Sequence, residues 1–209
     1  MSGAIARASR LPDWTFVLGL PTTQREFMAA QVYGEYARRF PCFAQYEQFF
    51  LTHFKKLIVP LERLYGLRLL RYPNSASYAH QMTRQRNVLL LTHCSPEGKL
   101  EFADGMIPFS DIVRRVSTEF AGITEICACE PLGLNRLLKR RAPSCVATIR
   151  MEKLEGPEWL VYCARLLMEF YPGPTTYWDA ALKVNYLLQG RTGEPLPAMP
   201  SGFAEVPDQ

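Results

Sequence analysis

The chain has 209 residues, of which 48% are hydrophobic and 21% are charged. These values are typical of a globular domain that buries its own core, and they exclude a disordered chain, a collagen, a coiled coil and a disulfide-stabilised miniprotein. The 24 Lys and Arg residues outnumber the 20 Asp and Glu residues by only four, an excess too mild to indicate a nucleic-acid-binding protein, so nucleic acid is expected as an indirect partner at most.

The N-terminal third of the chain is predicted to contain one strand followed by helices. Residues 14–20 (WTFVLGL) have the composition of a short strand. A threonine cap with an acidic residue in the first turn predicts a helix over residues 22–40. Apolar residues at helical spacing predict further helix over residues 43–64, which Pro60 is expected to kink or split.

From residue 66 onward, strands are predicted to alternate with helices. Residues 67–72 favour a strand and residues 75–84 a short helix. Residues 87–92 (NVLLLT) form an apolar run of strand length, as in a buried parallel strand. Turn-forming residues indicate a loop over residues 94–99, and an Asp-Gly turn indicates a small hairpin or loop over residues 100–108.

The last third continues the alternation. Ser110 is predicted to cap a helix over residues 111–121. The remaining predicted elements are strands over residues 123–129 (ITEICAC) and 144–150 and helices over residues 132–141, 157–170 and 175–189.

This order of elements predicts an α/β fold with a mostly parallel sheet between helices. We expect three parts: an N-terminal strand and helical segment over residues 1–65 packed on the core, an α/β core over residues 66–190, and a flexible tail over residues 191–209 that is rich in Pro, Gly and small residues. Ligands of such sheets bind outside the carboxyl ends of the strands, so chemistry is expected there.

Two residue types that support nucleophilic catalysis stand at predicted strand ends. His93 follows the strand over residues 87–92, and Cys129 ends the strand over residues 123–129. A cysteine nucleophile needs a base or cation nearby to hold it as a thiolate, and an imidazole supplies both. Cys127 lies on the same strand face as Cys129, so spacing alone leaves either thiol as the nucleophile.

The histidine and cysteine segments together resemble those of caspase-like (clan CD) cysteine peptidases, particularly the bacterial CHAT branch. VLLLTHCSPEGKLEFADGMIPFSDI (residues 88–112) is similar to the histidine segment of the family, and ITEICACEPLGLNRLLKRRAPSCVATIR (residues 123–150) is similar to its cysteine segment. The helix YWDAALKVNYLL (residues 177–188) also resembles the closing helix of that branch. The resemblance covers about residues 66–189 and implies a three-layer α-β-α caspase-like fold.

The resemblance implies a thiol protease, a hydrolase that cleaves a protein substrate with a His93–Cys129 dyad and no metal or other cofactor. It favours Cys129 over Cys127 as the nucleophile. The backbone N–H groups of Cys129 and Cys94 would form the oxyanion hole. Because the chain lacks a sensor domain of the size such proteases usually carry, a regulatory protein partner is expected. Candidates for a substrate pocket are Glu97, Asp104, Glu125, Glu130 and Arg150.

Other interpretations remain open. The family usually has Gly after the histidine where this chain has Cys94, and Glu130-Pro131 follow the cysteine. These departures favour a catalytically inactive caspase-like module that acts as a binding or assembly subunit. A metal or redox site built from Cys94, Cys127, Cys129 and His93 is a third reading.

The remaining features concern the cellular setting. The first residues lack the apolar run of a signal peptide, and no apolar run approaches the roughly 20 residues of a membrane span. The six cysteines are expected to be reduced, and the protein to be cytoplasmic with no membrane partner. Residues 1–150 hold 20 basic and 12 acidic side chains, so the front of the chain is either a solvated basic surface or a contact face for an acidic partner.

Overall fold

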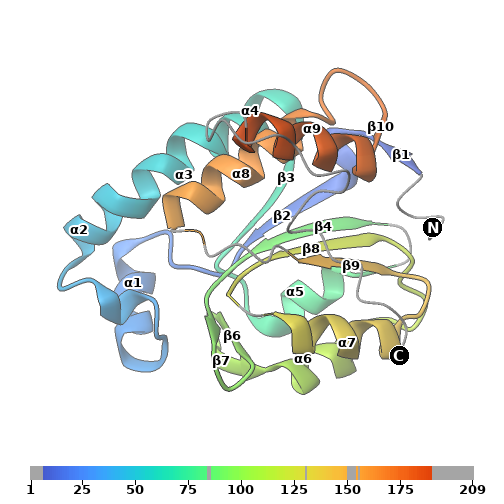
Figure 1. Cartoon of the computed structure of the whole chain (residues 1–209). Coiled ribbons are helices and arrows are strands. Elements are labelled where there is room, and N and C mark those ends of the chain that lie inside the picture. Colours follow the sequence, from blue (N-terminus) through green and yellow to red (C-terminus); the bar gives the residue numbers. More distant parts are fainter. Residues whose placement is uncertain (1–6, 84–85, 130, 150–153, 155, 190–209) are drawn as a thin grey trace.

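The computed structural model describes residues 7–83, 86–129, 131–149, 154 and 156–189 (Figure 1). Five parallel strands form its central sheet in the order β3-β2-β4-β8-β9. The strands are β2 (Trp14–Leu18), β3 (Arg68–Arg71), β4 (Asn87–Leu91), β8 (Ile123–Cys127) and β9 (Val146–Ile149). The predicted α/β class with a parallel sheet is therefore confirmed.

Helices cover both faces of the sheet. One face carries α5 (Ser75–Gln81), α6 (Phe109–Arg115) and α7 (Leu132–Arg141). The other carries α3 (Thr52–Leu57), α4 (Val59–Tyr65), α8 (Gly156–Met168) and α9 (Tyr177–Gln189). The remaining helical segments are η1 (Leu11–Asp13), α1 (Gln24–Tyr33), η2 (Ala37–Arg39), α2 (Phe43–Tyr46) and the π-helical turn η3 (Glu47–Leu51).

The strand β4 shows why both faces are apolar. Successive side chains of a strand point to opposite faces. Val88 and Leu90 pack with the cluster under α5, α6 and α7, whereas Leu89 and Leu91 pack with the cluster under α3, α4, α8 and α9. A strand buried on both sides has no polar alternation, which is why its sequence is a continuous apolar run.

Residues 1–65, expected to pack on the core, also supply part of it. β2 lies inside the sheet, between β3 and β4. The tail over residues 191–209 lies outside the described residues.

The first helix begins as predicted but ends earlier. Thr23 Oγ1 accepts the N–H of Glu26, and Glu26 Oε2 accepts the N–H of Thr23, so the capping box forms. The helix stops at Tyr33 rather than near residue 40. The reason is that the buried carboxylate of Glu101 accepts the next two backbone N–H groups, those of residues 35 and 36. In a continued helix those groups would donate to carbonyls four residues earlier.

One further helix boundary differs from the predictions, and one predicted break within a helix is confirmed. α6 begins at Phe109, so Ser110 lies inside the helix and does not cap it; Pro108 holds the N-cap position. The helix predicted over residues 43–64 is divided, with α3 ending at Leu57 and α4 beginning at Val59. Pro60 occupies the first turn of α4, where its missing N–H removes no helical hydrogen bond, so the predicted split is confirmed.

Two small antiparallel sheets accompany the central one. β5 (Cys94–Ser95), β6 (Lys99–Phe102) and β7 (Gly105–Pro108) form the predicted hairpin with an added strand where a loop was expected. β1 (Ala8–Ser9) pairs with β10 (Thr175–Thr176). Within the described part of the chain, no helix is long and apolar enough to cross a membrane.

Candidate functional site

The order of the strands directs attention to the carboxyl ends of β2 and β4. β2 comes first in the chain, β3 pairs with it on one side and β4 pairs with it on the other. Connections that leave two neighbouring strands in opposite directions open a crevice at those strand ends, where ligands of open α/β sheets bind. His93 lies two residues after the end of β4, and α1 and hairpin β6–β7 lie at this end of the sheet (Figure 1).

A pocket of about 250 Å³ lies at this end of the sheet. His93 and Cys129, the two residues predicted to be catalytic, both line it. The remaining lining residues are Glu35, Arg39, Cys94, Ser95 and Pro96. His93 is only 8% exposed, whereas Cys129 is exposed to solvent. The fold therefore brings together the histidine and the cysteine that follow neighbouring strands.

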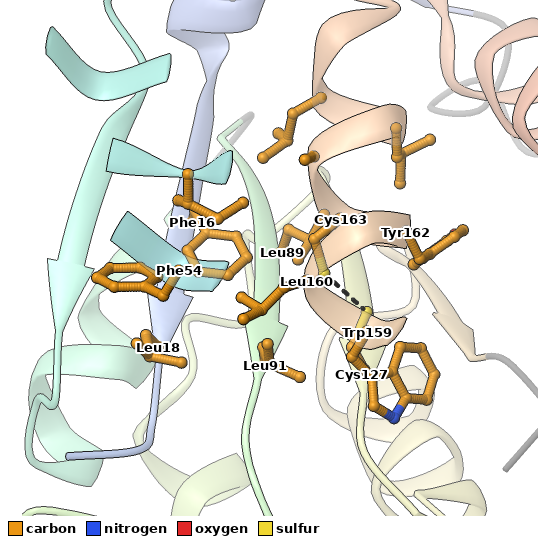
Figure 2. Packing of buried hydrophobic residues seen from close by; sticks show 14 of the residues in the cluster. Phe16, Leu18, Phe54, Leu89, Leu91, Cys127, Trp159, Leu160, Tyr162 and Cys163 are labelled. Carbon is orange, nitrogen blue, oxygen red and sulfur yellow. Dashed lines mark hydrogen bonds between the residues drawn. The ribbon is translucent and has the colours of Figure 1, made fainter. Parts of the chain in front are cut away.

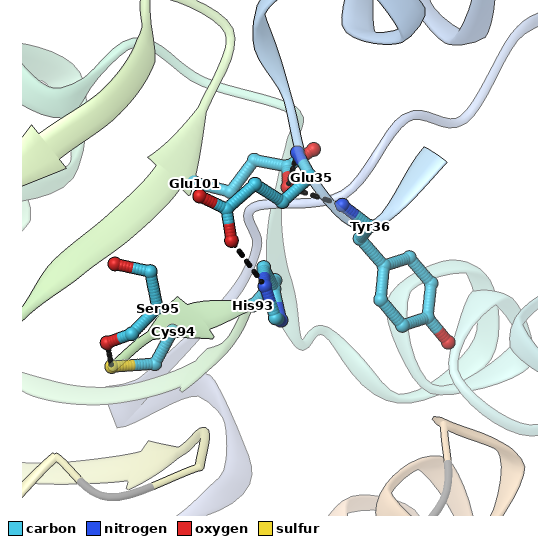
Figure 3. Close-up of polar contacts among 6 residues, drawn as sticks. All are labelled: Glu35, Tyr36, His93, Cys94, Ser95 and Glu101. Carbon is cyan, nitrogen blue, oxygen red and sulfur yellow. Dashed lines mark hydrogen bonds and ion pairs between the residues drawn. The ribbon is translucent and has the colours of Figure 1, made fainter. Parts of the chain in front are cut away.

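The ring of His93 is held by a carboxylate. Nε2 of His93 lies 3.1 Å from Oε2 of Glu35, which follows α1 (Figure 3). Because an ionised carboxylate only accepts hydrogen bonds, this contact places a proton on Nε2 and, in the neutral ring, leaves Nδ1 as the basic nitrogen. Nδ1 has no hydrogen-bond partner among the described residues, and Cys129 is not hydrogen-bonded to His93 there.

The environment of His93 keeps its imidazole neutral at neutral pH. Burial is the largest influence and lowers the pKa of His93, and the nearby guanidinium of Arg39 lowers it further. The hydrogen bond and the charge of Glu35 act in the opposite direction without reversing the shift. A neutral imidazole is the form that can accept a proton from a thiol.

Glu101 on β6 fixes the segment that carries Glu35. Its Oε2 accepts the backbone N–H groups of Glu35 and Tyr36 at 2.9 and 2.8 Å (Figure 3). Its own backbone N–H donates to the carbonyl of His93 at 3.0 Å. Glu101, Glu35 and His93 are thus each in contact with the other two, and these contacts set the position of the His93 ring. Burial raises the pKa of the Glu101 carboxyl, and these two N–H donors partly offset the rise.

Cys94, the residue after His93, is buried in β5. Its Sγ lies 3.5 Å from the carbonyl oxygen of Ser95 (Figure 3). Cys94 lies opposite Leu100 in the β5–β6 ladder. The neighbouring pair, His93 and Glu101, is hydrogen-bonded through the backbone. Hydrogen-bonded and non-hydrogen-bonded pairs alternate along an antiparallel ladder, so the N–H of Cys94 faces away from Leu100.

The two candidate nucleophiles are in different surroundings. Cys127 is fully buried under α8, and its Sγ lies 3.7 Å from Sγ of Cys163 (Figure 2). Cys129 opens onto the pocket. A substrate in the pocket can therefore reach the thiol of Cys129 but not that of Cys127. Within the described residues there is no cluster of three or more His, Cys, Asp or Glu side chains that could hold a metal ion.

The acidic residues predicted for a substrate pocket are dispersed. Glu97 is exposed on the β5–β6 turn, where the nearby Ser95 side chain is the largest influence that lowers the pKa of its carboxyl. Asp104 accepts the N–H and the hydroxyl of Ser75 at 2.9 and 2.6 Å. Glu125 is fully buried in β8, where it is an acceptor for the hydroxyl groups of Thr148, Tyr162 and Tyr177.

None of these three acidic residues lines the pocket that holds His93 and Cys129. Glu130 and Arg150 lie outside the described residues.

Sequence reasoning did not single out Glu35, Arg39 or Glu101. One signal was available: the connection after β2 must leave from the same sheet edge as His93, so polar residues in that connection were candidates. Glu101 alternates with apolar neighbours in a predicted hairpin, which is the pattern of a solvent-facing residue, and nothing local indicates its burial.

Comparison of the sequence with models of known protein families finds no family that matches, and the search of curated proteins finds no match either.

Proposed function

We propose that the protein is a caspase-like cysteine peptidase in which Cys129 is the nucleophile and His93 the general base and acid. The observation that carries this proposal is the shared pocket: the exposed Cys129 and the buried, carboxylate-held imidazole of His93 line one pocket at the carboxyl ends of the neighbouring parallel strands β4 and β8. The order of His before Cys and the hairpin after His93 agree with the family resemblance in the sequence.

The geometry around His93 suggests which atoms act. Glu35 holds the proton on Nε2, so Nδ1 takes the proton of the Cys129 thiol as the sulfur attacks the scissile carbonyl. The same Nδ1 then donates that proton to the leaving amine, and water hydrolyses the acyl-enzyme. Sγ and Nδ1 are not hydrogen-bonded in the described structure, so a side-chain movement within the pocket that both residues line has to bring them together.

The oxyanion of the tetrahedral intermediate needs donors beside Cys129. We assign this role to the backbone N–H of Cys129 and that of Cys94, which faces away from β6. A side chain at position 94 does not remove its N–H, so the absence of Gly there is compatible with this role. The substrate is a protein chain, and a regulatory protein partner is part of the proposal.

Cysteine alkylation tests the dyad, because the chain provides its own control. Of its six cysteines, all described, only Cys42 and Cys129 are exposed. We expect iodoacetamide at neutral pH to label Cys129 faster than Cys42, since a neighbouring imidazole raises the thiolate fraction. His93→Ala should slow the labelling of Cys129 to the rate at Cys42 and leave Cys42 unchanged. Equal rates in the wild type would contradict the proposal.

Hydrolysis is tested separately with a proteome-derived peptide library and mass spectrometry of new termini. New termini that vanish in both Cys129→Ala and His93→Ala support the peptidase. A reactive Cys129 without new termini, at matched folding of all three proteins, would favour the inactive binding or assembly subunit.

A further inference from the structure

A second pocket lies at the opposite end of the sheet. It has a volume of about 490 Å³ and lies at the amino ends of three neighbouring strands. Asp13 precedes β2, Arg68 begins β3 and Arg86 precedes β4. β4 has 5 residues, so its two ends are about 13 Å apart and this pocket is separate from the one that contains His93.

The lining of this pocket is strongly basic. Three arginines contribute to it, Arg7, Arg68 and Arg86, against one acidic residue, Asp13. The lining therefore carries a net charge of +2, and one carboxylate oxygen of Asp13 already accepts the backbone N–H of Arg10 at 2.7 Å. The side chain of Arg68 makes no hydrogen bond or ion pair with the described residues. Burial, and then the proximity of Arg68, lowers the pKa of Arg86.

A buried hydroxyl completes the set of donors. Ser9 lines the pocket and is 4% exposed. Its Oγ accepts a hydrogen bond from Nε1 of Trp14 at 3.3 Å, which leaves the hydroxyl proton of Ser9 without an acceptor among the described residues. A recess that gathers guanidinium groups and a spare hydroxyl donor offers many donors and few acceptors, which is the chemistry that recognises an oxyanion.

We propose that this pocket binds a small molecule that carries a phosphate group. A phosphate monoester has a charge of roughly −1.5 to −2 at neutral pH, and its three oxygens can accept from Arg68, Arg86 and the hydroxyl of Ser9 together. A single carboxylate would leave charge and donors unused. The volume lies within the roughly 300–1,000 Å³ of small-molecule sites. The site also accounts for part of the basic excess of residues 1–150.

Isothermal titration at low salt tests the proposal with inorganic phosphate, ribose 5-phosphate and AMP as probes. We expect single-site binding of at least one phosphate ester. Arg68→Gln and Arg86→Gln should each weaken it by about tenfold or more, because each removes charge-assisted hydrogen bonds. Arg68→Lys should weaken it less than Arg68→Gln, since the charge remains and the planar fork is lost. A preference for AMP over ribose 5-phosphate would place the base in the pocket.

Arg25→Gln is the matched control, because it removes the same charge from an exposed position on α1. No binding of any probe at millimolar concentration would overturn the proposal, and so would an equal loss in Arg25→Gln and Arg68→Gln, which would mean attraction to net charge alone. Binding of a glutamate-rich peptide in preference to all three probes would also overturn it. If Arg86→Gln fails to fold, the binding measured with Arg68→Gln alone tests the proposal. None of these readouts depends on Cys129.

Discussion

Oε2 of Glu35 lies 3.1 Å from Nε2 of His93, and this contact joins two residues that are 58 positions apart in the chain. Glu35 is on the connection that leaves β2, and His93 is on the connection that leaves β4. Their contact therefore links the two sides of the crevice between these strands. It determines which ring nitrogen is basic and therefore how His93 can serve a nucleophile.

The first prediction concerns the titration of His93. Its pKa is lowered mainly by burial, and Glu35 opposes that shift through both its hydrogen bond and its charge. Glu35→Gln removes the charge but keeps an acceptor, so the pKa of His93 should fall further. Proton NMR of the imidazole C–H signals, assigned with His93→Gln, measures this change. His53, an exposed residue on α3, provides the internal control.

The direction of the His93 pKa shift also predicts how the stability of the protein depends on pH. A histidine with a lowered pKa in the folded state binds a proton more readily when unfolded, so its contribution is lost as pH falls below about 6.5. In Glu35→Gln this loss should continue to a lower pH than in the wild type. An unchanged or raised pKa of His93 in Glu35→Gln would show that the contact with Glu35 does not form in solution.

The second prediction concerns Gly34, which ends α1 just before Glu35. A Cβ atom at this position would lie 2.3 Å from Oε1 of Glu101 and 2.9 Å from the carbonyl oxygen of Ala30. Gly34→Ala must therefore displace the Glu101 carboxylate, and the overpacking should cost about 1–3 kcal/mol in the free energy of unfolding. We expect the pKa of His93 to fall in this variant as it does in Glu35→Gln, because Glu35 loses its fixed position.

Gly173→Ala is the control for this experiment, because an added Cβ there meets nothing within 4 Å. Urea denaturation of both variants beside the wild type measures the difference. Equal stability of Gly34→Ala and Gly173→Ala would mean that the contacts of Glu101 with the backbone are loose.

Much of the fold follows from local patterns in the sequence. The continuous apolar run of β4 predicts a buried parallel strand, and the alternation of strands with helices predicts the parallel sheet. Once the strands are parallel and adjacent, His93 and Cys129 must lie at the same edge. The shared pocket could thus be predicted without knowledge of any side-chain contact.

The contacts that position His93 could not be predicted in the same way. The end of α1 depends on Glu101, which lies 66 positions after Glu35 and reaches it only in the folded chain. Local propensity therefore predicts a longer helix than the one that forms. Glu125 shows a different error. It is predicted as a candidate for a substrate pocket but is fully buried in β8, and the polar residues at positions 124 and 125 give no local sign that both faces of this strand are buried.

The third prediction concerns this buried carboxylate. Glu125 is the acceptor for three hydroxyl groups between β8, β9 and the helices α8 and α9. Glu125→Ala removes that acceptor from the core and should cost on the order of 2–4 kcal/mol in the free energy of unfolding. Glu97→Ala, at an exposed turn, should leave the stability unchanged. Thermal unfolding of the two variants tests this, and equal melting temperatures would contradict it.

Glu125→Ala also separates a core role from a substrate role. At a temperature where the variant is folded, we expect its rate of Cys129 alkylation to equal that of the wild type, because Glu125 does not line the pocket. A changed cleavage-site preference in the peptide library with unchanged stability would return Glu125 to the substrate pocket.

The fourth prediction distinguishes the two cysteines of the Cys127-Ala128-Cys129 segment. Cys127 is fully buried against Cys163, in the cluster that α8 covers (Figure 2). Replacing its thiol with a hydroxyl in apolar surroundings should cost about 1–3 kcal/mol in the free energy of unfolding. Cys129→Ser changes an exposed side chain and should leave the stability nearly unchanged while it abolishes the fast alkylation.

The two variants therefore have opposite signatures: Cys127→Ser is less stable but keeps a reactive Cys129, and Cys129→Ser is stable but unreactive. Measurement of both properties on both proteins tests the assignment of the nucleophile, which would pass to Cys127 if Cys127→Ser kept its stability and lost the fast-labelling site.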